Sequence, residues 1–301
     1  MRDDAGRDRL QPECMTCLAG KYPDLYPADA PGDRIMEYVR GCLSIIAEAS
    51  PDLAAPVLVR DMNDLHEKLF GDRIAYTEEK SYYNQLMLRQ EDWLWEEIKK
   101  AEDPLEKALQ FAIIGNYIDL SAFRKIDEAY LRESMRETDR FPLQQVAYQN
   151  LKRDLKQAKK LVLLADNCGE ILVDKLLLSL IREQYPGIDM TVIVKGYPVQ
   201  NDATTEDAGE CGLTEQFRVL PNGNDIAGTW LPELSGEARG ALEEADLILS
   251  KGQANLETLR GVGWNIYYIF MCKCHMLSRE YGVPKMTGML LQEKDSWGRK
   301  G

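Results

Sequence analysis

Three segments of the sequence carry side chains suited to metal and phosphate chemistry, and each of them follows a short apolar run. They are residues 166–170, 201–202 and 251–255. In open α/β sheets, ligands bind just beyond the carboxyl ends of the strands. Because those ends lie at one edge of a sheet, we expect the three segments to form a single site.

Oxygen ligands dominate the first two segments. Asp166 and Asn167 follow the apolar run 161–165, and Asp202 follows the run 190–194. Neighbouring parallel strands lie about 4.8 Å apart, so Asp166 and Asp202 could share one cation. Carboxylate and amide oxygens favour hard divalent ions such as Mg²⁺ or Mn²⁺. The alternative, on spacing alone, is that both aspartates cap the helices that follow them.

Two further features of these segments suit a phosphate. Gly169 permits a tight turn, and the helix after it is expected to present free backbone N–H groups to an anion. Lys251 is a cation on a flexible stem beside Gly252, which allows close approach of the backbone. A solvated turn lysine is the alternative for Lys251, and without the other segments we would favour it.

The cysteines predict a second, separate cluster. Cys14 with Cys17 and Cys272 with Cys274 form two close pairs near the two ends of the chain. Four thiolates from these pairs could hold a structural zinc ion, whereas ordinary buried thiols are the alternative. Only two histidines occur among the 301 residues, which excludes a histidine-rich metal site.

Composition narrows the class of protein. With 45% hydrophobic and 29% charged residues, the chain resembles a soluble globular protein. A net charge of −13 repels phosphate backbones, so we expect no nucleic-acid partner. We find no apolar run approaching the roughly 20 residues of a membrane span, and no signal peptide. We therefore expect a cytoplasmic protein with no membrane partner, and the oligomeric state stays unknown.

Residues before about position 155 show helical patterns. Asp103-Pro104-Leu105-Glu106 predicts a helix start, because Asp caps well, Pro suits the first turn and Glu completes a capping box. Gly71 is expected to end a helix that Ser50-Pro51 opens. The other helices are expected over residues 77–101 and 142–156.

After residue 155, short apolar runs alternate with helical stretches, which favours a parallel sheet with helices on both faces. The strands are expected over residues 161–165, 190–194, 246–249 and 267–271. We predict an α/β fold whose doubly wound, mostly parallel, Rossmann-like three-layer domain spans residues 156–301. Residues 1–155 are predicted to form an all-helical N-terminal domain that caps it.

Together these motifs resemble the damage-control phosphatase family, also known as domain of unknown function 89. The matching segments are residues 115–119, 166–170 with Asp174, 195–204 and 251–257. Cys14, Cys17 and Cys272 are similar to those of a cysteine-containing subgroup with mostly archaeal and bacterial members. The resemblance implies a helical domain capping an α/β domain.

The resemblance also implies a metal-dependent phosphatase acting on phosphorylated small metabolites, such as sugar phosphates or damaged metabolites. Asp166, Asn167 and Asp202 would bind a divalent Mn, Mg, Co or Ni ion, and Lys251 would contact the substrate phosphate. Asp166 would act as a ligand or also as the nucleophile. The residues expected to contact the substrate are Glu170, Asn116, Asp119, Asn201, Lys251 and Asn255. Asn116 and Asp119 interrupt an apolar helical stripe, so we expect both to reach the crevice, and the alternative is that they cap the end of that helix.

Two other functions remain open on the sequence. A doubly wound sheet also hosts group transferases, such as methyltransferases, in the same crevice. No glycine-rich dinucleotide loop follows the first strand and no P-loop motif occurs, which disfavours the common nucleotide cofactor sites. A non-enzymatic zinc-binding or redox protein would rest on the cysteines alone.

Overall fold

The computed structural model describes residues 9–71, 76–116 and 128–296. Its central feature is a six-stranded sheet in the order β3-β2-β1-β4-β5-β6, in which β6 alone runs antiparallel to its neighbour. The strands are β1 (Lys160–Leu164), β2 (Asp189–Val194), β3 (Arg218–Pro221), β4 (Leu247–Lys251), β5 (Ile266–Cys272) and β6 (Thr287–Gln292).

Successive residues of the strands enter two different cores, because helices cover both faces of the sheet. Leu161 and Leu163 belong to one core, whereas Val162 and Leu164 belong to the other. This alternation explains why the strands read as continuous apolar runs in the sequence. The predicted α/β class, with its doubly wound and mostly parallel sheet, is confirmed.

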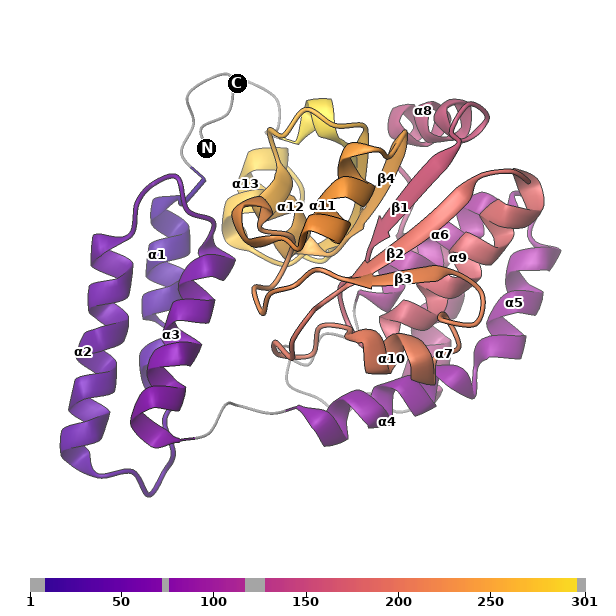
Figure 1. Cartoon of the computed structure of the whole chain (residues 1–301). Helices are drawn as coiled ribbons and strands as arrows, with labels where there is room; N and C mark the ends of the chain where they lie inside the picture. The colour runs from indigo at the N-terminus through magenta and orange to yellow at the C-terminus, as the bar shows by residue number, and fades with distance from the viewer. Residues whose placement is uncertain (1–8, 72–75, 117–127, 297–301) are drawn as a thin grey trace.

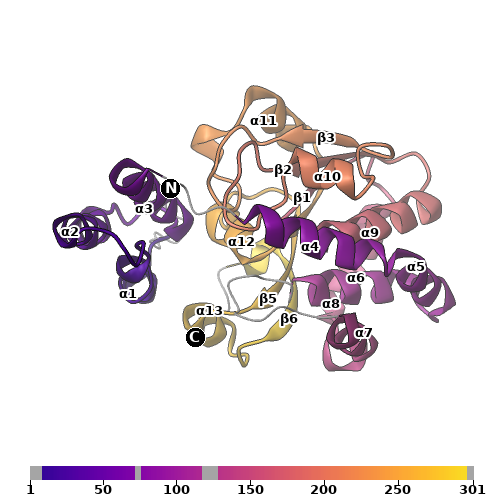
Figure 2. The ribbon, with the colours of Figure 1, turned by 90° about the horizontal axis from the view of Figure 1, so that it is seen from below.

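One face of the sheet is covered by helices from both halves of the chain (Figure 2). These are α4 (Thr77–Leu88), α5 (Glu91–Lys100), α6 (Pro104–Gly115), α7 (Glu128–Arg136), α8 (Gln145–Leu155), α9 (Glu170–Gln184) and α10 (Thr205–Glu210). The other face is covered by α11 (Gly236–Glu243), α12 (Gln253–Leu259) and α13 (His275–Tyr281).

The first three helices form a bundle beside this body (Figure 1). They are α1 (Pro12–Ala19), α2 (Gly32–Glu48) and α3 (Ala55–Phe70), and they share a core of their own. An ion pair from Arg60 to Glu233 joins the bundle to the body at 3.0 Å. The division of the chain at residue 155 remains a prediction, and helices α4–α8 share their core with the sheet.

Several helix ends follow their predicted signals and others do not. The backbone N–H of Glu106 donates to Asp103 Oδ1, so the predicted cap forms, and Gly71 ends α3 with φ 91°. Ser50-Pro51 does not open α3, because Pro56 supplies the proline of its first turn. The helix predicted over 77–101 divides at Gln90, and that predicted over 142–156 begins at Gln145.

The strand order reverses between β1 and β4. Strands β2 and β3 lie on one side of this pair, next to β1, whereas β5 and β6 lie on the other side, next to β4. Such a switch point is where open α/β sheets bind ligands. Within the described residues, no helix is long and apolar enough to cross a membrane.

Candidate active site

The two predicted metal segments lie side by side beyond β1 and β2. Their backbones are joined directly, because Ala203 N donates to Asp166 O at 2.7 Å and Cys168 N donates to Asn201 O at 2.8 Å. Asn167 and Asp202 form an isolated antiparallel bridge between the segments. The expectation that residues 166–170 and 201–202 meet at one edge of the sheet is confirmed.

Two amide side chains hold the carboxylates of Asp166 and Glu170 together. Asn167 Nδ2 donates to Asp166 Oδ2 at 2.8 Å and to Glu170 Oε2 at 2.7 Å. Asn116 Nδ2 donates to the same two oxygens at 2.8 and 3.0 Å. Within the described part of the chain, no hydrogen bond reaches Asp166 Oδ1, which leaves this oxygen available to a ligand.

Asn116 brings the end of α6 into the site. Its Oδ1 accepts from the backbone N–H of Met271 in β5, at 3.1 Å, so the amide links the sheet to both carboxylates. This position agrees with the expectation that Asn116 reaches the crevice, and its contact with substrate stays a prediction. Asp119 lies outside the described residues.

Lys251 lies beneath the site, between two carboxylates. Its Nζ donates to Glu170 Oε1 at 2.5 Å and to Asp174 Oδ1 at 2.6 Å, and all three side chains are fully buried. Burial alone would lower the pKa of Lys251, but Asp174 and Glu170 raise it above its ordinary value. The ammonium is therefore charged and neutralises Glu170. Its predicted contact with a substrate phosphate remains a prediction.

A second lysine balances Asp202. Lys195 follows β2, and its Nζ lies 3.4 Å from Asp202 Oδ2 and donates to the backbone oxygen of Gly228. Both side chains of the pair are buried. Lys195 thus supplies a fixed positive charge at the second metal segment.

The electrostatics at Asp166 are those of a crowded anionic site. Burial raises the pKa of Asp166 well above its ordinary value, and Asp202 and Glu170 raise it further. Lys273 and Lys195 oppose this rise. Like charges that are buried together are costly unless a cation relieves them.

The formal charge of the buried cluster matches a divalent ion. Four carboxylates, those of Asp166, Glu170, Asp174 and Asp202, face two ammonium groups, those of Lys195 and Lys251, which gives −2 when all are ionised. Carboxylate oxygens are hard ligands, which suit Mg²⁺ or Mn²⁺. Within the described residues, no three His, Cys, Asp or Glu side chains converge as a metal site, and the metal ligands stay a prediction.

The start of α9 does not offer its N–H groups to an anion. Gly169 adopts φ 67°, and its N–H donates to Asn84 Oδ1 at 2.6 Å. The N–H groups of Glu170 and Ile171 donate to the backbone oxygens of Cys168 and Asn167. The expected phosphate cradle at Gly169 is therefore wrong, because the turn and α4 satisfy these donors.

Two of the expected substrate residues have structural partners. Asn201 Nδ2 donates to Asn167 Oδ1 at 2.8 Å. Asn255 Nδ2 donates to the backbone oxygens of Ala165 and Lys251, which ties the ends of β1 and β4 together. Their contacts with substrate stay predictions.

Comparison with known proteins decides the family. The model of the damage-control phosphatase ARMT1-like domain matches residues 10–288, which is most of the chain. A damage-control phosphatase of Archaeoglobus fulgidus is 31% identical over 281 residues, covering 91% of this chain and 96% of the relative. This chain belongs to the damage-control phosphatase family.

Other family members agree in length and fold. A damage-control phosphatase of Pyrococcus horikoshii is 28% identical over 305 residues, covering 95% of this chain and 99% of that one. A crystal structure of a protein of the DUF89 family from the same organism matches with a TM-score of 0.78 and 27% identity. It covers 94% of this chain and 99% of that chain. The resemblance inferred from the motifs is confirmed.

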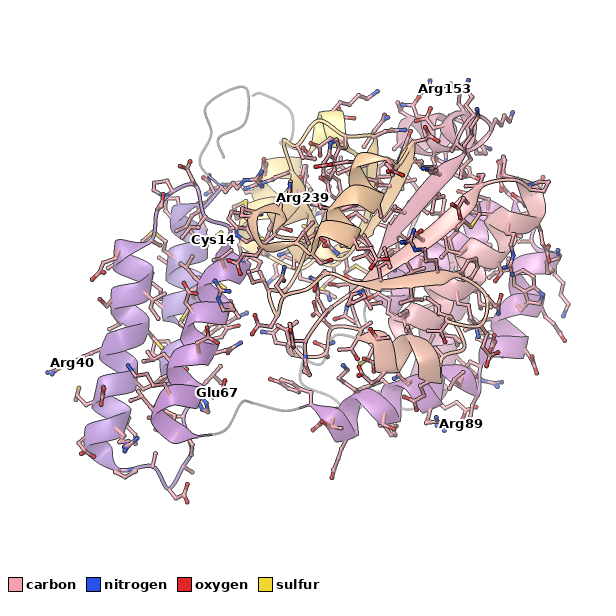
Figure 3. The ribbon with its side chains drawn as sticks, viewed as in Figure 1. Cys14, Arg40, Glu67, Arg89, Arg153 and Arg239 are labelled. Atoms are coloured by element: carbon pink, nitrogen blue, oxygen red, sulfur yellow. The ribbon has the colours of Figure 1, made fainter. Side chains whose placement is uncertain are left out.

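The cysteines of this family member lie outside the acidic site. Cys14 lies where α1 meets α13 (Figure 3). Cys17 is exposed, Cys272 ends β5 and Cys274 caps α13. Burial raises the pKa of Cys14 to about 12 and that of Cys272 to about 11. All four are free, and the zinc site stays a prediction.

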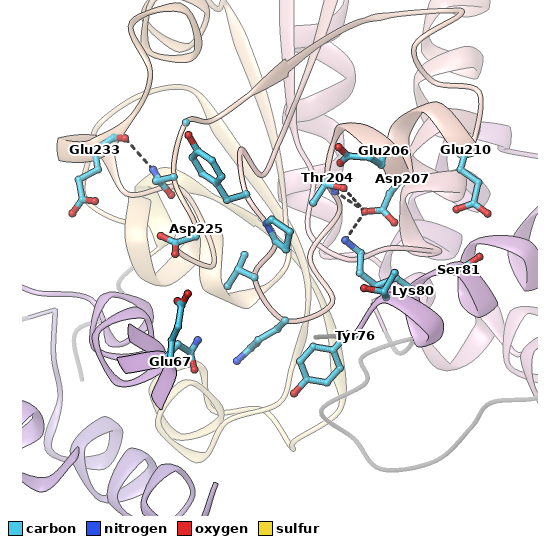
Figure 4. Close-up of a pocket in the computed structure, with 18 of the residues that line it drawn as sticks. Glu67, Tyr76, Lys80, Ser81, Thr204, Glu206, Asp207, Glu210, Asp225 and Glu233 are labelled. Carbon is cyan, nitrogen blue, oxygen red and sulfur yellow. Dashed lines mark hydrogen bonds and ion pairs between the residues drawn. The ribbon is translucent and has the colours of Figure 1, made fainter. Parts of the chain in front are cut away.

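A pocket of about 970 Å³ opens beside the loop that carries Asp202 (Figure 4). It lies between the bundle, α4 and residues 197–200. Six acidic side chains and one lysine line it within the described residues, namely Glu67, Glu206, Asp207, Glu210, Asp225, Glu233 and Lys80. None of the predicted site residues lines this pocket.

Sequence reasoning missed three contributors to the site. Lys195 and Lys273 directly follow β2 and β5, so the rule that identified Asp166 would also have found them. Asn84 has no comparable signal, because it lies in the middle of α4 and its partners are distant in the sequence.

Proposed function

We propose that this protein is a phosphatase that uses a divalent metal ion to hydrolyse phosphomonoesters of small metabolites. The observation that carries the proposal is the buried, formally −2 cluster at the switch point of the sheet, in which one oxygen of Asp166 accepts no hydrogen bond from the residues that the structure describes. Two similar archaeal proteins bear the name damage-control phosphatase, which supports the same reaction class.

The oxygens of Asp166, Asn167 and Asp202 would hold the metal. When bound, it would neutralise phosphoryl charge and favour attack by water. Any of Mn, Mg, Co or Ni is compatible with these ligands, and the preferred ion is a matter for experiment.

The protein's own residues fix the geometry of that site. Asn116 and Asn167 hold the carboxylate of Asp166 against Glu170 through Oδ2, so that Oδ1 would be the oxygen that binds the metal. Lys251 neutralises Glu170 from below, which limits the net repulsion on an incoming phosphate. Lys273 adds positive charge near Asp166. Preorganised charges of this kind account for much of the catalysis in phosphoryl transfer.

The substrate is proposed to be a phosphorylated small molecule, such as a sugar phosphate or a damaged metabolite. The family name points to this class. A group transferase gains no comparable support, since the site lacks the glycine-rich loop of a nucleotide cofactor.

Phosphate release from a panel of sugar and nucleotide monophosphates tests the proposal. Wild-type protein with an excess of Mn²⁺, Mg²⁺, Co²⁺ or Ni²⁺ should hydrolyse at least one of them. Asp166→Asn should lose at least ~10³-fold in kcat/KM if the residue acts on the reacting centre. Release at the wild-type rate by Asp166→Asn would contradict this site, and no release from any substrate would contradict the proposed reaction.

Rapid acid quench of wild-type protein during turnover distinguishes two routes. If Asp166 is the nucleophile, rapid acid quench of wild-type turnover should trap phosphate on this residue. If water attacks directly, no phosphate stays with the protein.

A further inference from the structure

Helix α4 lies against both segments that carry the predicted metal ligands. It packs on α9, which follows the Asp166 turn, and on α10, which follows the Asp202 loop (Figures 1 and 2). One fully buried side chain of α4, Asn84, contacts both sides.

On the first side, Asn84 holds the turn after Asp166. Its Oδ1 accepts from the backbone N–H of Gly169 at 2.6 Å. The turn packs closely on α4 at this point, because a Cβ on Gly169 would lie only 3.1 Å from the backbone oxygen of Tyr83. The absence of a side chain at residue 169 therefore allows the contact with Asn84.

On the second side, Asn84 holds the helix after Asp202. Its Nδ2 donates to Asp207 Oδ1 and to Glu210 Oε2, each at 2.8 Å. Asp207 Oδ2 in turn accepts from the backbone N–H and the hydroxyl of Thr204, both at 2.8 Å. Thr204 lies two residues after Asp202, so this chain of contacts fixes the end of the ligand-bearing loop.

A lysine one helical turn earlier strengthens the second contact. Lys80 Nζ lies 2.6 Å from Asp207 Oδ2, and Figure 4 shows this pair with the bonds from Thr204. Lys80 and Asn84 are four residues apart and therefore share one face of α4. The ion pair with Lys80 therefore holds Asp207 in place from the same face of α4 that carries Asn84.

We propose that Asn84 is a positioning residue of the phosphatase site, which holds the Asp166 turn and the Asp202 loop at a fixed separation. An amide suits this role because it supplies one acceptor for Gly169 N–H and donors for two carboxylates. The inference rests on the proposed function, and it predicts that Asn84 controls how well Asp166 and Asp202 bind one ion.

Two substitutions test it. Asn84→Ala removes the hydrogen bond from Gly169 and the hydrogen bonds to Asp207 and Glu210. Asn84→Asp has nearly the same size and keeps an acceptor, but it places a carboxylate against Asp207 and Glu210. Residues that orient metal ligands typically contribute 10–100-fold to activity or metal affinity. We expect kcat to fall by about that factor in both variants, with a smaller change in KM.

The second readout does not depend on turnover. Mn²⁺ should raise the Tm of metal-stripped wild-type protein by mass action. In both variants, the Mn²⁺ concentration needed for a given rise in Tm should increase at least tenfold, on the order expected for an outer ligand contact. A purely structural role would lower Tm without moving this concentration.

Gln85→Ala is the matched control. Gln85 is the next residue on α4, and it donates to Glu210 Oε1 at 2.7 Å in an exposed position. It makes no contact with Gly169, so Gln85→Ala should keep the wild-type kcat and Mn²⁺ response.

An unchanged kcat and Mn²⁺ response in folded Asn84→Ala would overturn the inference. If Asn84→Ala does not fold, Asn84→Asp decides by the same criteria. If wild-type protein releases no phosphate at all, the proposed function fails, whereas the Mn²⁺ response of Asn84→Asp still decides the positioning role.

Discussion

Two amide side chains hold Asp166 beside Glu170 although both carboxylates carry negative charge. Asn116 and Asn167 each donate to Asp166 Oδ2 and to Glu170 Oε2. Lys251 offsets the charge of Glu170 from the other side. Among the described residues, no hydrogen bond reaches the other oxygen of Asp166, Oδ1. The chemistry we propose depends on this arrangement of neighbours as much as on Asp166 itself.

Lys251 should contribute to stability as well as to any catalytic role. Lys251→Met leaves Glu170 and Asp174 buried without their cation, and breaking a buried pair in this way costs about 3–5 kcal/mol. Urea denaturation should show this loss in the free energy of unfolding. Lys100→Met, at an exposed pair with Glu96, should cause no measurable change. Wild-type stability in Lys251→Met would contradict the buried contacts.

The pH dependence of stability should report Asp174. Burial raises its pKa to about 7, whereas Lys251 lowers it in part. A carboxyl in the unfolded chain has a pKa near 4. The folded protein therefore binds more protons between about pH 4 and 7, and the contribution of Asp174 to stability falls as the pH rises through this range.

Asp174→Asn should accordingly flatten the loss of stability between pH 4 and 7. The free energy of unfolding, measured by urea denaturation at several pH values, gives the slope for each protein. Some slope should remain, because the pKa of Asp166 is also raised. Identical slopes in wild-type and variant proteins would show that Asp174 keeps an ordinary pKa.

Much of the site was predictable from the sequence because strand ends in a parallel sheet meet at one edge. That rule placed Asp166 beside Asp202 correctly. It could not predict that Lys251 turns to Glu170 and Asp174, since this depends on how α9 packs over β4. It also could not show that Asn84 accepts a hydrogen bond from the N–H of Gly169, because no pattern in the sequence of α4 identifies that partner.

At the scale of elements, long apolar runs were predictable and short ones were not. Strands β1, β2, β4 and β5 lie within two residues of their predicted bounds. Strand β3 was missed because it is only four residues long and ends in Pro221. Strand β6 was missed because its buried residues include Gly288 and because it pairs antiparallel at the edge of the sheet.

The junction of β4 and α12 should tolerate no side chain at Gly252. This residue has φ 78°, and a Cβ there would lie 2.0 Å from Asp166 Cγ. Gly252→Ala should displace the Asp166 carboxylate and reduce kcat/KM by about 10²-fold, the scale expected for a misplaced reacting group. Phosphate release under metal excess measures this.

Gly236→Ala supplies the control for that experiment. Gly236 begins α11, and nothing lies within 4 Å of a Cβ placed there. The control should therefore keep wild-type activity. Full activity in Gly252→Ala would mean that Asp166 does not need the position it has here.

At the scale of the whole molecule, negative charge exceeds positive charge, and acidic side chains line a pocket next to the Asp202 loop. The net charge is −13, and the pocket beside the Asp202 loop is lined by six acids and Lys80. An anionic substrate would be repelled by this surface unless a bound cation reversed the local sign. The charge of the molecule and the charge of the buried cluster therefore both favour a metal-dependent reaction.

Phosphate release by metal-stripped protein, followed as Mn²⁺ is added, tests this account most directly. Wild-type protein should release no phosphate with a chelator present and should gain activity as the ion saturates the site. Asp202→Asn removes one proposed ligand, so it should need at least ~10-fold more Mn²⁺ for half-maximal activity. Equal release with chelator and with Mn²⁺, in protein verified to be free of metal, would contradict a metal-dependent phosphatase.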